Sequence, residues 1–224
     1  MVRDVTIITV HYNTPVLLAS LLASVRRWYP DVPITVIDGS DQAPYRWAAI
    51  VLGRRYGASV DTIGSNIHHG PGLDRGIRAA KTPLVLVMDS DVRFTRAGVI
   101  ERAVEALRPD DFGVGGIQWV DDTGWDVPAG QGTPYLHPRL ALIRRAAYLE
   151  GPPAIKHGAP FLPVMEHLST SQAWAIRQLD GLNDYFVEHR YGTVERTGSG
   201  QLEGDGMGRP MKRIRRAARR LLRK

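Results

Sequence analysis

The chain has 224 residues, 43% of them hydrophobic, which is enough for one large domain with an extensive core. It contains no cysteine, which excludes a disulfide scaffold, a thiol nucleophile and thiolate metal sites. No run approaches the roughly 20 apolar residues that cross a bilayer, and a strand-like pattern follows Met1 at once, without a secretory signal. We therefore expect a cytoplasmic protein.

The formal net charge of +6 belongs to one end of the chain. Residues 209–224 carry nine lysines and arginines and no acid, which leaves 20 basic and 23 acidic residues elsewhere. A glycine-rich segment, 198–208, predicts a linker before this basic tail. Pro210 suits a helix start, and the tail has a narrow apolar stripe formed by Met211, Ile214, Ala218, Leu221 and Leu222. Such a helix could bind an anionic membrane or nucleic-acid phosphates; a solvated tail is the third alternative.

The first half of the chain alternates predicted strands and helices. Thr14 can cap the first helix, and Pro15 suits its first position. Strands are predicted at 5–10, 33–37, 58–63 and 84–88, with helices after Thr14, over 45–56, and from the glycine-rich loop 64–72 to about residue 80. This β-α-β-α-β-α-β order predicts a mostly parallel sheet flanked by helices.

The second half is less regular. We predict helices over 95–107 and from a Ser169 cap to about 179, strands at 113–120, 140–143 and 185–189, and a loop over 121–138. Gly70, Gly72 and Gly76 superficially suggest a dinucleotide fingerprint, but that motif should follow the first strand, so an NAD enzyme is not expected. His68 and His69 are expected to be ordinary loop residues.

Two aspartates, Asp89 and Asp91, directly follow the apolar run 84–88. Ligands bind at the carboxyl ends of strands in open α/β sheets, and two carboxylates on one turn suit a hard divalent cation that also holds substrate phosphates. The pattern predicts a metal-dependent enzyme for a phosphorylated substrate such as a nucleotide-sugar. Residues 38–41, at the end of the second strand, could add a carboxylate to this edge or form a plain turn.

Four segments together resemble the family 2 glycosyltransferases, which have the GT-A fold. They are Ile7–Asn13, Val36–Ser40, Asn66–Ala80 and Asp89–Asp91, in the family's order and spacing. The resemblance implies a single catalytic domain over 1–197. It would have a Rossmann-like nucleotide-sugar-binding half, 1–94, and an irregular acceptor-binding half, 95–197.

The resemblance also implies roles for residues of the first half. Tyr12 would stack on the nucleotide base, and Asp38 would accept a hydrogen bond from a uracil- or guanine-type ring N–H. Asp91 would bind Mn²⁺ or Mg²⁺ directly, with Asp89 on the ribose or on the metal, and His189 would be a further metal ligand. The cation would stabilise the charge on the departing diphosphate. The other implied donor-binding residues are Thr9, Asn13, Asp74 and Ser90.

The catalytic base is less well defined. Members of the family often have a Glu-Asp pair at a helix start, and the nearest match here is Glu166 followed by His167. Glu166 is therefore the first choice of base, and the alternatives are Asp126, Asp121 and Asp122. Four aromatic residues of the second half could stack on acceptor sugars or simply pack in the core: Trp119, Trp125, Tyr135 and Trp174.

The function implied is transfer of a sugar from a nucleotide-sugar to an acceptor hydroxyl, with inversion, and with a membrane-proximal glycan or lipid as acceptor. One alternative is a glycosyltransferase that modifies nucleic acid or protein docked by the basic tail. The other is a non-catalytic nucleotide-sugar-binding protein, which the missing Glu-Asp pair favours.

Overall fold

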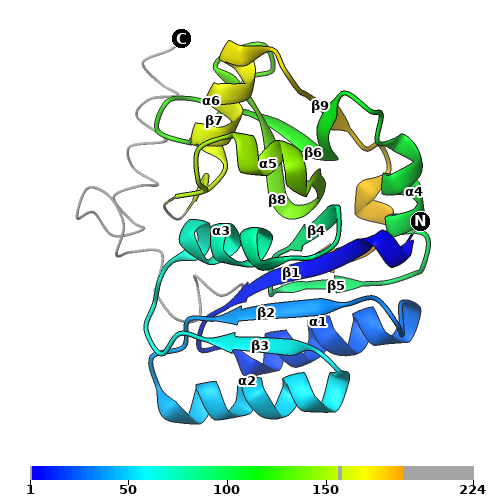
Figure 1. The fold of residues 1–224 in the computed structure, drawn as a ribbon, viewed down its shortest axis with the longest axis vertical. Coiled ribbons are helices and arrows are strands. Elements are labelled where there is room, and N and C mark those ends of the chain that lie inside the picture. Colours follow the sequence, from blue (N-terminus) through cyan, green and yellow to red (C-terminus); the bar gives the residue numbers. More distant parts are fainter. Residues whose placement is uncertain (1, 156–157, 189–224) are drawn as a thin grey trace.

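A computed structural model describes residues 2–155 and 158–188, and its centre is a mixed, eight-stranded sheet (Figure 1). Four neighbouring strands, all from the first half of the chain, are parallel. β1 (Val5–His11) lies between β2 (Ile34–Asp38) and β4 (Leu84–Met88), and β3 (Ser59–Thr62) pairs with the outer edge of β2. The predicted parallel α/β half is therefore confirmed.

The second half of the chain extends the same sheet with antiparallel strands. β8 (Thr133–Arg144) pairs with β4, and β6 (Asp111–Val120) pairs with β8. β7 (Asp126–Val127) pairs with β6 in the antiparallel direction, whereas β9 (Ala175–Gln178) pairs with β6 in parallel. A separate two-stranded sheet joins β5 (Val92–Phe94) to β10 (Phe186–Glu188).

Helices cover both faces of the sheet and enclose two cores (Figure 1). One core takes residues from α1 (Pro15–Trp28), α2 (Ala43–Tyr56) and α4 (Val99–Ala106). The other takes residues from α3 (His69–Ala79), α5 (Arg145–Glu150) and α6 (Leu162–Ser171). Short 3₁₀ helices span Val2–Asp4 and Leu182–Asp184.

The strands that carry the predicted site are buried on both faces. Ile7 of β1 packs in the first core and Ile8 in the second, and all five residues of β4 are buried. Burial on two faces explains why these strands are continuous apolar runs and do not alternate with polar residues. In the part of the chain that the structure describes, no helix is long and apolar enough to cross a membrane.

Several element predictions for the second half are wrong. The residues expected to form a helix from Ser169 to about 179 instead end α6 at Ser171 and form β9 from Ala175. The predicted loop 121–138 contains β7 and the first residues of β8, and the predicted strand at 140–143 is only the end of β8.

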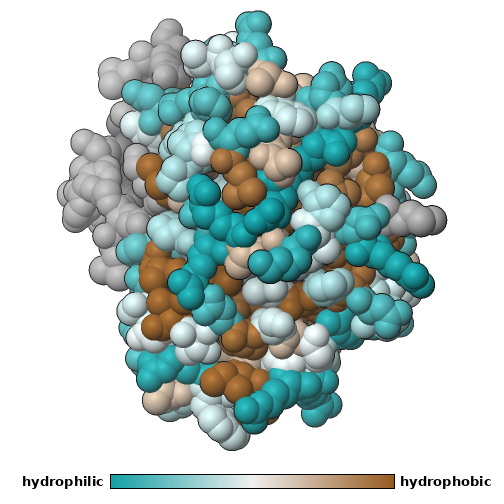
Figure 2. All heavy atoms as spheres, in the orientation of Figure 1, coloured by the Kyte–Doolittle hydropathy of each residue, from teal (hydrophilic) through white to brown (hydrophobic). Residues whose placement is uncertain are grey.

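Apolar and polar side chains are interspersed on the face seen in Figure 2.

Candidate functional site

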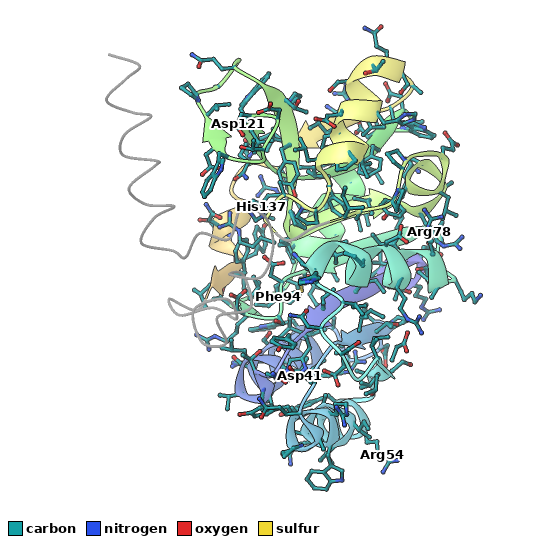
Figure 3. The ribbon with its side chains drawn as sticks, turned by 90° about the vertical axis from the view of Figure 1, so that its left-hand side faces the viewer. Asp41, Arg54, Arg78, Phe94, Asp121 and His137 are labelled. Atoms are coloured by element: carbon teal, nitrogen blue, oxygen red, sulfur yellow. The ribbon has the colours of Figure 1, made fainter. Side chains whose placement is uncertain are left out.

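The carboxyl ends of β1, β2 and β4 meet at one edge of the sheet, and Figure 3 shows this edge with Asp41 and His137 labelled. The register pairs His11, the last residue of β1, with Asp38, the last residue of β2. Asp89 follows the last residue of β4. Strand pairing therefore brings residues distant in sequence to one edge, where α/β folds bind ligands.

The Asp38 carboxylate is held by three hydrogen bonds. His11 Nδ1 lies 2.9 Å from Asp38 Oδ1, and the Ser40 hydroxyl and backbone N–H donate to the same oxygen at 2.6 and 3.1 Å. Both His11 and Asp38 are completely buried. Burial alone would raise the pKa of Asp38, but the hydrogen bonds from His11 and Ser40 outweigh it and hold the pKa below its ordinary value.

The hydrogen bonds of His11 define its tautomer. Its Nε2 accepts a hydrogen bond from the Thr14 backbone N–H at 3.1 Å, so this nitrogen carries no proton. The proton of the neutral imidazole then lies on Nδ1 and is donated to Asp38. Thr14 occupies the predicted N-cap position of α1, but its side chain makes no cap hydrogen bond. His11 therefore joins the start of α1 to the end of β2.

Tyr12 and Asn13 form an outer layer over this buried group. The Tyr12 hydroxyl and the Asn13 amide donate to the two oxygens of Asp41 at 2.9 and 2.8 Å, and the Asn13 N–H donates to Ser40 Oγ at 3.0 Å. Partial burial and the Asp41 carboxylate raise the pKa of Tyr12. Asn13 has a left-handed φ of 51°, which asparagine tolerates better than most residues. The turn that presents Tyr12 is thus fixed from both sides.

Asp89, Ser90 and Asp91 form the connection between β4 and β5. The Asp89 N–H donates to the Arg139 carbonyl at 3.2 Å, and Asp89 Oδ1 lies 3.2 Å from His69 Nε2. Burial opposes the charged form of Asp89, but the hydrogen bond and charge of His69, with smaller effects of His137 and Arg139, hold its pKa below the ordinary value. Ser90 is buried and Asp91 half-buried.

Sequence reasoning missed the basic residues around Asp89. The expectation that His69 is an ordinary loop residue is wrong, since it begins α3 and pairs with Asp89. His137 and Arg139 come from β8, whose pairing with β4 the sequence did not reveal. His11 was also missed, although a histidine at the end of the first predicted strand was a usable signal.

Asp89 and Asp91 are hard oxygen donors of the kind that Mn²⁺ and Mg²⁺ accept, so their chemistry fits a divalent cation. The described residues contain no group of three or more metal-binding side chains. The predicted third ligand, His189, lies outside the described residues. A cation bound by the two aspartates would therefore need further oxygen atoms, such as those of a diphosphate.

Two predicted donor-binding residues, Thr9 and Asp74, are not part of the hydrogen-bonded groups described above. Thr9 is completely buried within β1, and within the described ranges its hydroxyl has no hydrogen-bond partner. Asp74 accepts hydrogen bonds from the Tyr148 hydroxyl at 2.8 Å and from Arg78 Nε at 2.9 Å, which links α3 to α5. Figure 3 shows Arg78 well separated from Asp41 and His137. The structure thus gives Asp74 a structural contact between two helices.

None of the candidate bases lies at a helix start. Glu166 is exposed in the second turn of α6, whose first turn contains no acidic residue. Asp121 Oδ1 accepts hydrogen bonds from Thr123 and from the Trp125 N–H, so it organises the turn after β6. Asp126 lies on β7 and is exposed, as is Asp122.

The aromatic residues of the second half divide into two groups. Tyr135 is completely buried and its hydroxyl accepts a hydrogen bond from the Phe161 N–H at 3.3 Å, so the prediction that it stacks on a sugar is wrong. Trp125 is exposed and Trp119 half-buried. Trp174 lines a cavity of about 150 Å³ with Pro134, Met165, Leu168, Ser169 and Ile176.

Comparison with solved structures identifies the same fold in enzymes of nucleotide-sugar chemistry. A mannosyltransferase from Pyrobaculum calidifontis, in complex with GDP-Man and Mn²⁺, superposes with a TM-score of 0.62 at 16% identity, covering 80% of this chain and 55% of that one. Glucosyl-3-phosphoglycerate synthase from Mycobacterium tuberculosis, with Mn²⁺, UDP and phosphoglyceric acid, gives 0.63 at 14% identity, covering 88% and 74%. S. aureus TarS 1–349, with UDP-GlcNAc, gives 0.57 at 17% identity, covering 86% and 60%.

These likenesses establish the GT-A fold. The chain spans little more than half of the mannosyltransferase. No curated protein is significantly similar in sequence to the chain. The family model of glycosyl transferase family 2 matches residues 6–162, which is well over half of the chain and includes the whole strand-end cluster. The chain therefore belongs to glycosyl transferase family 2.

Proposed function

We propose that the protein is a metal-dependent glycosyltransferase that binds a nucleotide-sugar at the carboxyl edge of β1, β2 and β4. The observation that carries this proposal is the pair of carboxylates, Asp38 and Asp89, whose pKa values the surrounding side chains hold low at the ends of β2 and β4. Charged carboxylates at a sheet edge suit a ligand with N–H groups and a phosphate-bound cation.

In this proposal the nucleoside lies over the ends of β1 and β2. Tyr12 offers an aromatic face for the base, and Asp38 a carboxylate for a ring N–H of uracil or guanine. Asn13, Ser40 and Asp41 support that surface through the hydrogen bonds described above. Two structural relatives were solved with uridine nucleotides and one with GDP-Man.

Asp91, Asp89 and His189 would hold Mn²⁺ or Mg²⁺, which would neutralise the developing charge on the leaving diphosphate. Two of the relatives contain Mn²⁺. Ser90 lies between the two aspartates, and its backbone and hydroxyl could contact the ribose or phosphates. The contact with His69 uses only Oδ1 of Asp89, so the other carboxylate oxygen, Oδ2, would face the ribose or the cation.

The reaction would be attack of an acceptor hydroxyl oxygen on the anomeric carbon. The new C–O bond forms as the bond to the diphosphate breaks, and the hydroxyl proton passes to a carboxylate on the opposite face of the sugar, which gives inversion. Glu166 remains the proposed base and Asp126 the alternative. The base must come within hydrogen-bond reach of the acceptor, so α6 or β7 would lie beside the acceptor in the complex.

The acceptor would bind against the second half of the chain, and we propose a glycan, lipid or polymer. Exposed Trp125 and the cavity beside Trp174 provide apolar faces of the kind that sugars and lipids contact. The basic tail, 209–224, lies outside the described residues. Its composition favours an anionic membrane surface as partner, and nucleic acid is the weaker alternative.

A non-catalytic nucleotide-sugar-binding protein is the second candidate. The absence of an acidic residue from the first turn of α6 favours it, because the family often carries its base at such a position. Such a protein would bind the donor without releasing nucleoside diphosphate.

Isothermal titration calorimetry with UDP-, GDP-, dTDP- and ADP-sugars, with and without Mn²⁺, tests the proposal. We expect one nucleotide class to bind in a Mn²⁺-dependent manner and Asp91→Asn to lower the affinity at least tenfold. Asp74→Asn is the matched control and should bind as the wild type does, because Asp74 contacts α5. Equal binding by Asp91→Asn, or no binding by the wild type, would contradict the proposal. Slow release of nucleoside diphosphate from the nucleotide-sugar by the wild type would support the enzyme over the non-catalytic alternative.

A further inference from the structure

The two oxygens of Asp38 have unequal environments. All three hydrogen bonds to this carboxylate, from His11 Nδ1, the Ser40 hydroxyl and the Ser40 N–H, end on Oδ1. Oδ2 is also buried, but no described residue donates a hydrogen bond to it. A buried carboxylate oxygen without a donor is costly, because it has given up water without a replacement. Such an atom in an otherwise satisfied group indicates a place for a ligand donor.

A buried donor without an acceptor lies in the loop that packs on Gly39, the residue after Asp38. The loop after β3 packs on Gly39, so that Asn66 Cα stands 3.7 Å from the position a Cβ on Gly39 would take. Asn66 Oδ1 accepts a hydrogen bond from the His68 N–H at 2.9 Å, which fixes the orientation of the side-chain amide. Its Nδ2 is buried, and within the described ranges nothing accepts from it. The end of β2 and the loop after β3 thus carry one acceptor and one donor for which the described residues supply no partner.

This donor and acceptor pair is complementary to one class of nucleobase edge. Uracil, thymine and guanine present a ring N–H next to a ring carbonyl, whereas cytosine and adenine have an unprotonated ring nitrogen at that place. A carboxylate facing an unprotonated ring nitrogen would leave two buried acceptors without a proton between them. For this reason, a site that binds its ligand through such a hydrogen bond strongly rejects a similar ligand that cannot form it.

We propose that His11 is the positioning residue that makes this discrimination possible. By holding Oδ1 through its Nδ1–H, it directs Oδ2 to the ring N–H of the base, while Asn66 Nδ2 donates to the adjacent carbonyl. The Thr14 N–H keeps His11 in the required tautomer. This inference rests on the proposed function, and it adds the two residues, His11 and Asn66, through which the class of base is selected.

Two variants separate the two hydrogen bonds of His11. In His11→Asn the amide nitrogen takes the place of Nδ1, so the donor to Asp38 is kept and the acceptor for Thr14 is lost. In His11→Gln the longer side chain brings the amide oxygen to the place of Nε2. This oxygen can still accept from the Thr14 N–H, but the donor to Asp38 is lost. Both variants remove the imidazole, so a general packing defect would affect them alike.

The experiment compares the calorimetric Kd values of UDP and GDP with those of CDP and ADP, in Mn²⁺, for the full chain. We expect the wild type to bind at least one of UDP and GDP about 100-fold more tightly than CDP and ADP. His11→Asn should keep most of this ratio of Kd values. In His11→Gln the ratio should be at least tenfold smaller than in the wild type. Asn66→Asp, which replaces the donor with an acceptor, should also reduce the ratio. Thermal unfolding of each variant measures its stability separately.

The outcomes distinguish the inference from the proposed function. If the wild type binds UDP or GDP selectively but His11→Gln keeps the full ratio, the inference is overturned and the proposed function stands. Affinity losses that are equal for all four nucleotides and follow the loss of thermal stability would mean that His11 is only structural. If the wild type binds none of the nucleotides, both the proposed function and the inference fail.

Discussion

Asp38 is a buried carboxylate and Asp89 a half-buried one, both at strand ends, and different partners keep them charged. The pKa of Asp38 is lowered first by hydrogen bonds from His11 and Ser40 and then by the charge of His11, whereas that of Asp89 is lowered by the hydrogen bond and charge of His69 and by the charges of His137 and Arg139. Asp38 therefore relies more on hydrogen bonds, and Asp89 more on nearby positive charge. This difference suits a base-binding residue on one side and a residue next to a cation and diphosphate on the other.

The lowered pKa of Asp38 has a consequence for stability. A carboxyl group with a depressed folded-state pKa contributes stability above its unfolded value of about 3.9 and loses it as the pH falls through the folded value. We expect Asp38→Asn to cost about 2 kcal/mol at pH 7. The difference from the wild type should be constant above about pH 5 and shrink below about pH 4. Urea unfolding across this range measures it, and a difference that grows on acidification would be inconsistent with a depressed pKa.

The role of Tyr12 can be divided between its ring and its hydroxyl. Tyr12→Ala removes the proposed stacking face and should weaken donor binding by about 1–2 kcal/mol, or roughly tenfold. Tyr12→Phe keeps the ring and loses only the bond to exposed Asp41, so its affinity should change less than threefold. Titration of the selected nucleotide measures both. Equal losses in the two variants would show that the hydroxyl, and not the ring, matters.

At the residue scale, the sequence predicted the ends of β2 and β4 correctly because apolar runs followed by aspartate mark where strands leave the core. Asp38, Asp89 and Asp91 were found in this way. His11 was missed because its partner depends on the register between β1 and β2. His69, His137 and Arg139 were missed because only tertiary packing brings α3 and β8 to Asp89.

Among the elements, β8 shows why the second half was harder to predict. It contains Pro134 and Pro138, which are typical of loops. The ladder with β6 passes from Gly115–Ala141 to Ile117–Leu136, and Pro138 lies in this irregularity, where a missing N–H is tolerated. Ser169 is a good helix cap in isolation, but the core against β8 places the helix earlier, over Leu162–Ser171.

A buried ion pair joins β6 to β9. Asp111 is completely buried and accepts two hydrogen bonds from Arg177, at 2.7 and 2.9 Å. Arg177→Met should destabilise the protein by roughly 2 kcal/mol, because the buried carboxylate loses both side-chain hydrogen bonds and keeps only the one from the Arg108 N–H. Arg75→Met, which breaks the exposed pair with Asp61, is the matched control and should cost less than about 1 kcal/mol. Chemical denaturation measures both, and equal costs would disagree with this ranking.

At the scale of the whole molecule, one sheet carries strands of both halves, because β8 pairs directly with β4. The proposed donor edge and the proposed acceptor half are therefore parts of one continuous structure. The general architecture was predictable from the order of elements in residues 5–94. The acceptor remains a proposal because it depends on irregular loops, in which residue type alone does not fix the contacts.

The basic tail, 209–224, should control binding of the protein to membranes and leave its affinity for the donor nucleotide unchanged. The full chain should co-sediment with vesicles containing anionic lipid, and less so as salt is added, because the attraction is electrostatic. A chain ending at residue 208 should lose this binding and keep the Kd for the donor nucleotide. Equal sedimentation of the two chains would refute a membrane role, and salt-sensitive DNA binding lost in the shorter chain would favour nucleic acid.

The most direct test of the central claim is a crystal structure of the protein with Mn²⁺ and the nucleotide-sugar selected by calorimetry. We predict that the base lies on Tyr12 with its ring N–H at hydrogen-bond distance from Asp38 Oδ2, and that Mn²⁺ contacts Asp91 and the diphosphate. A nucleotide bound elsewhere, or a metal without contact to either Asp89 or Asp91, would contradict the assignment of this edge as the donor site.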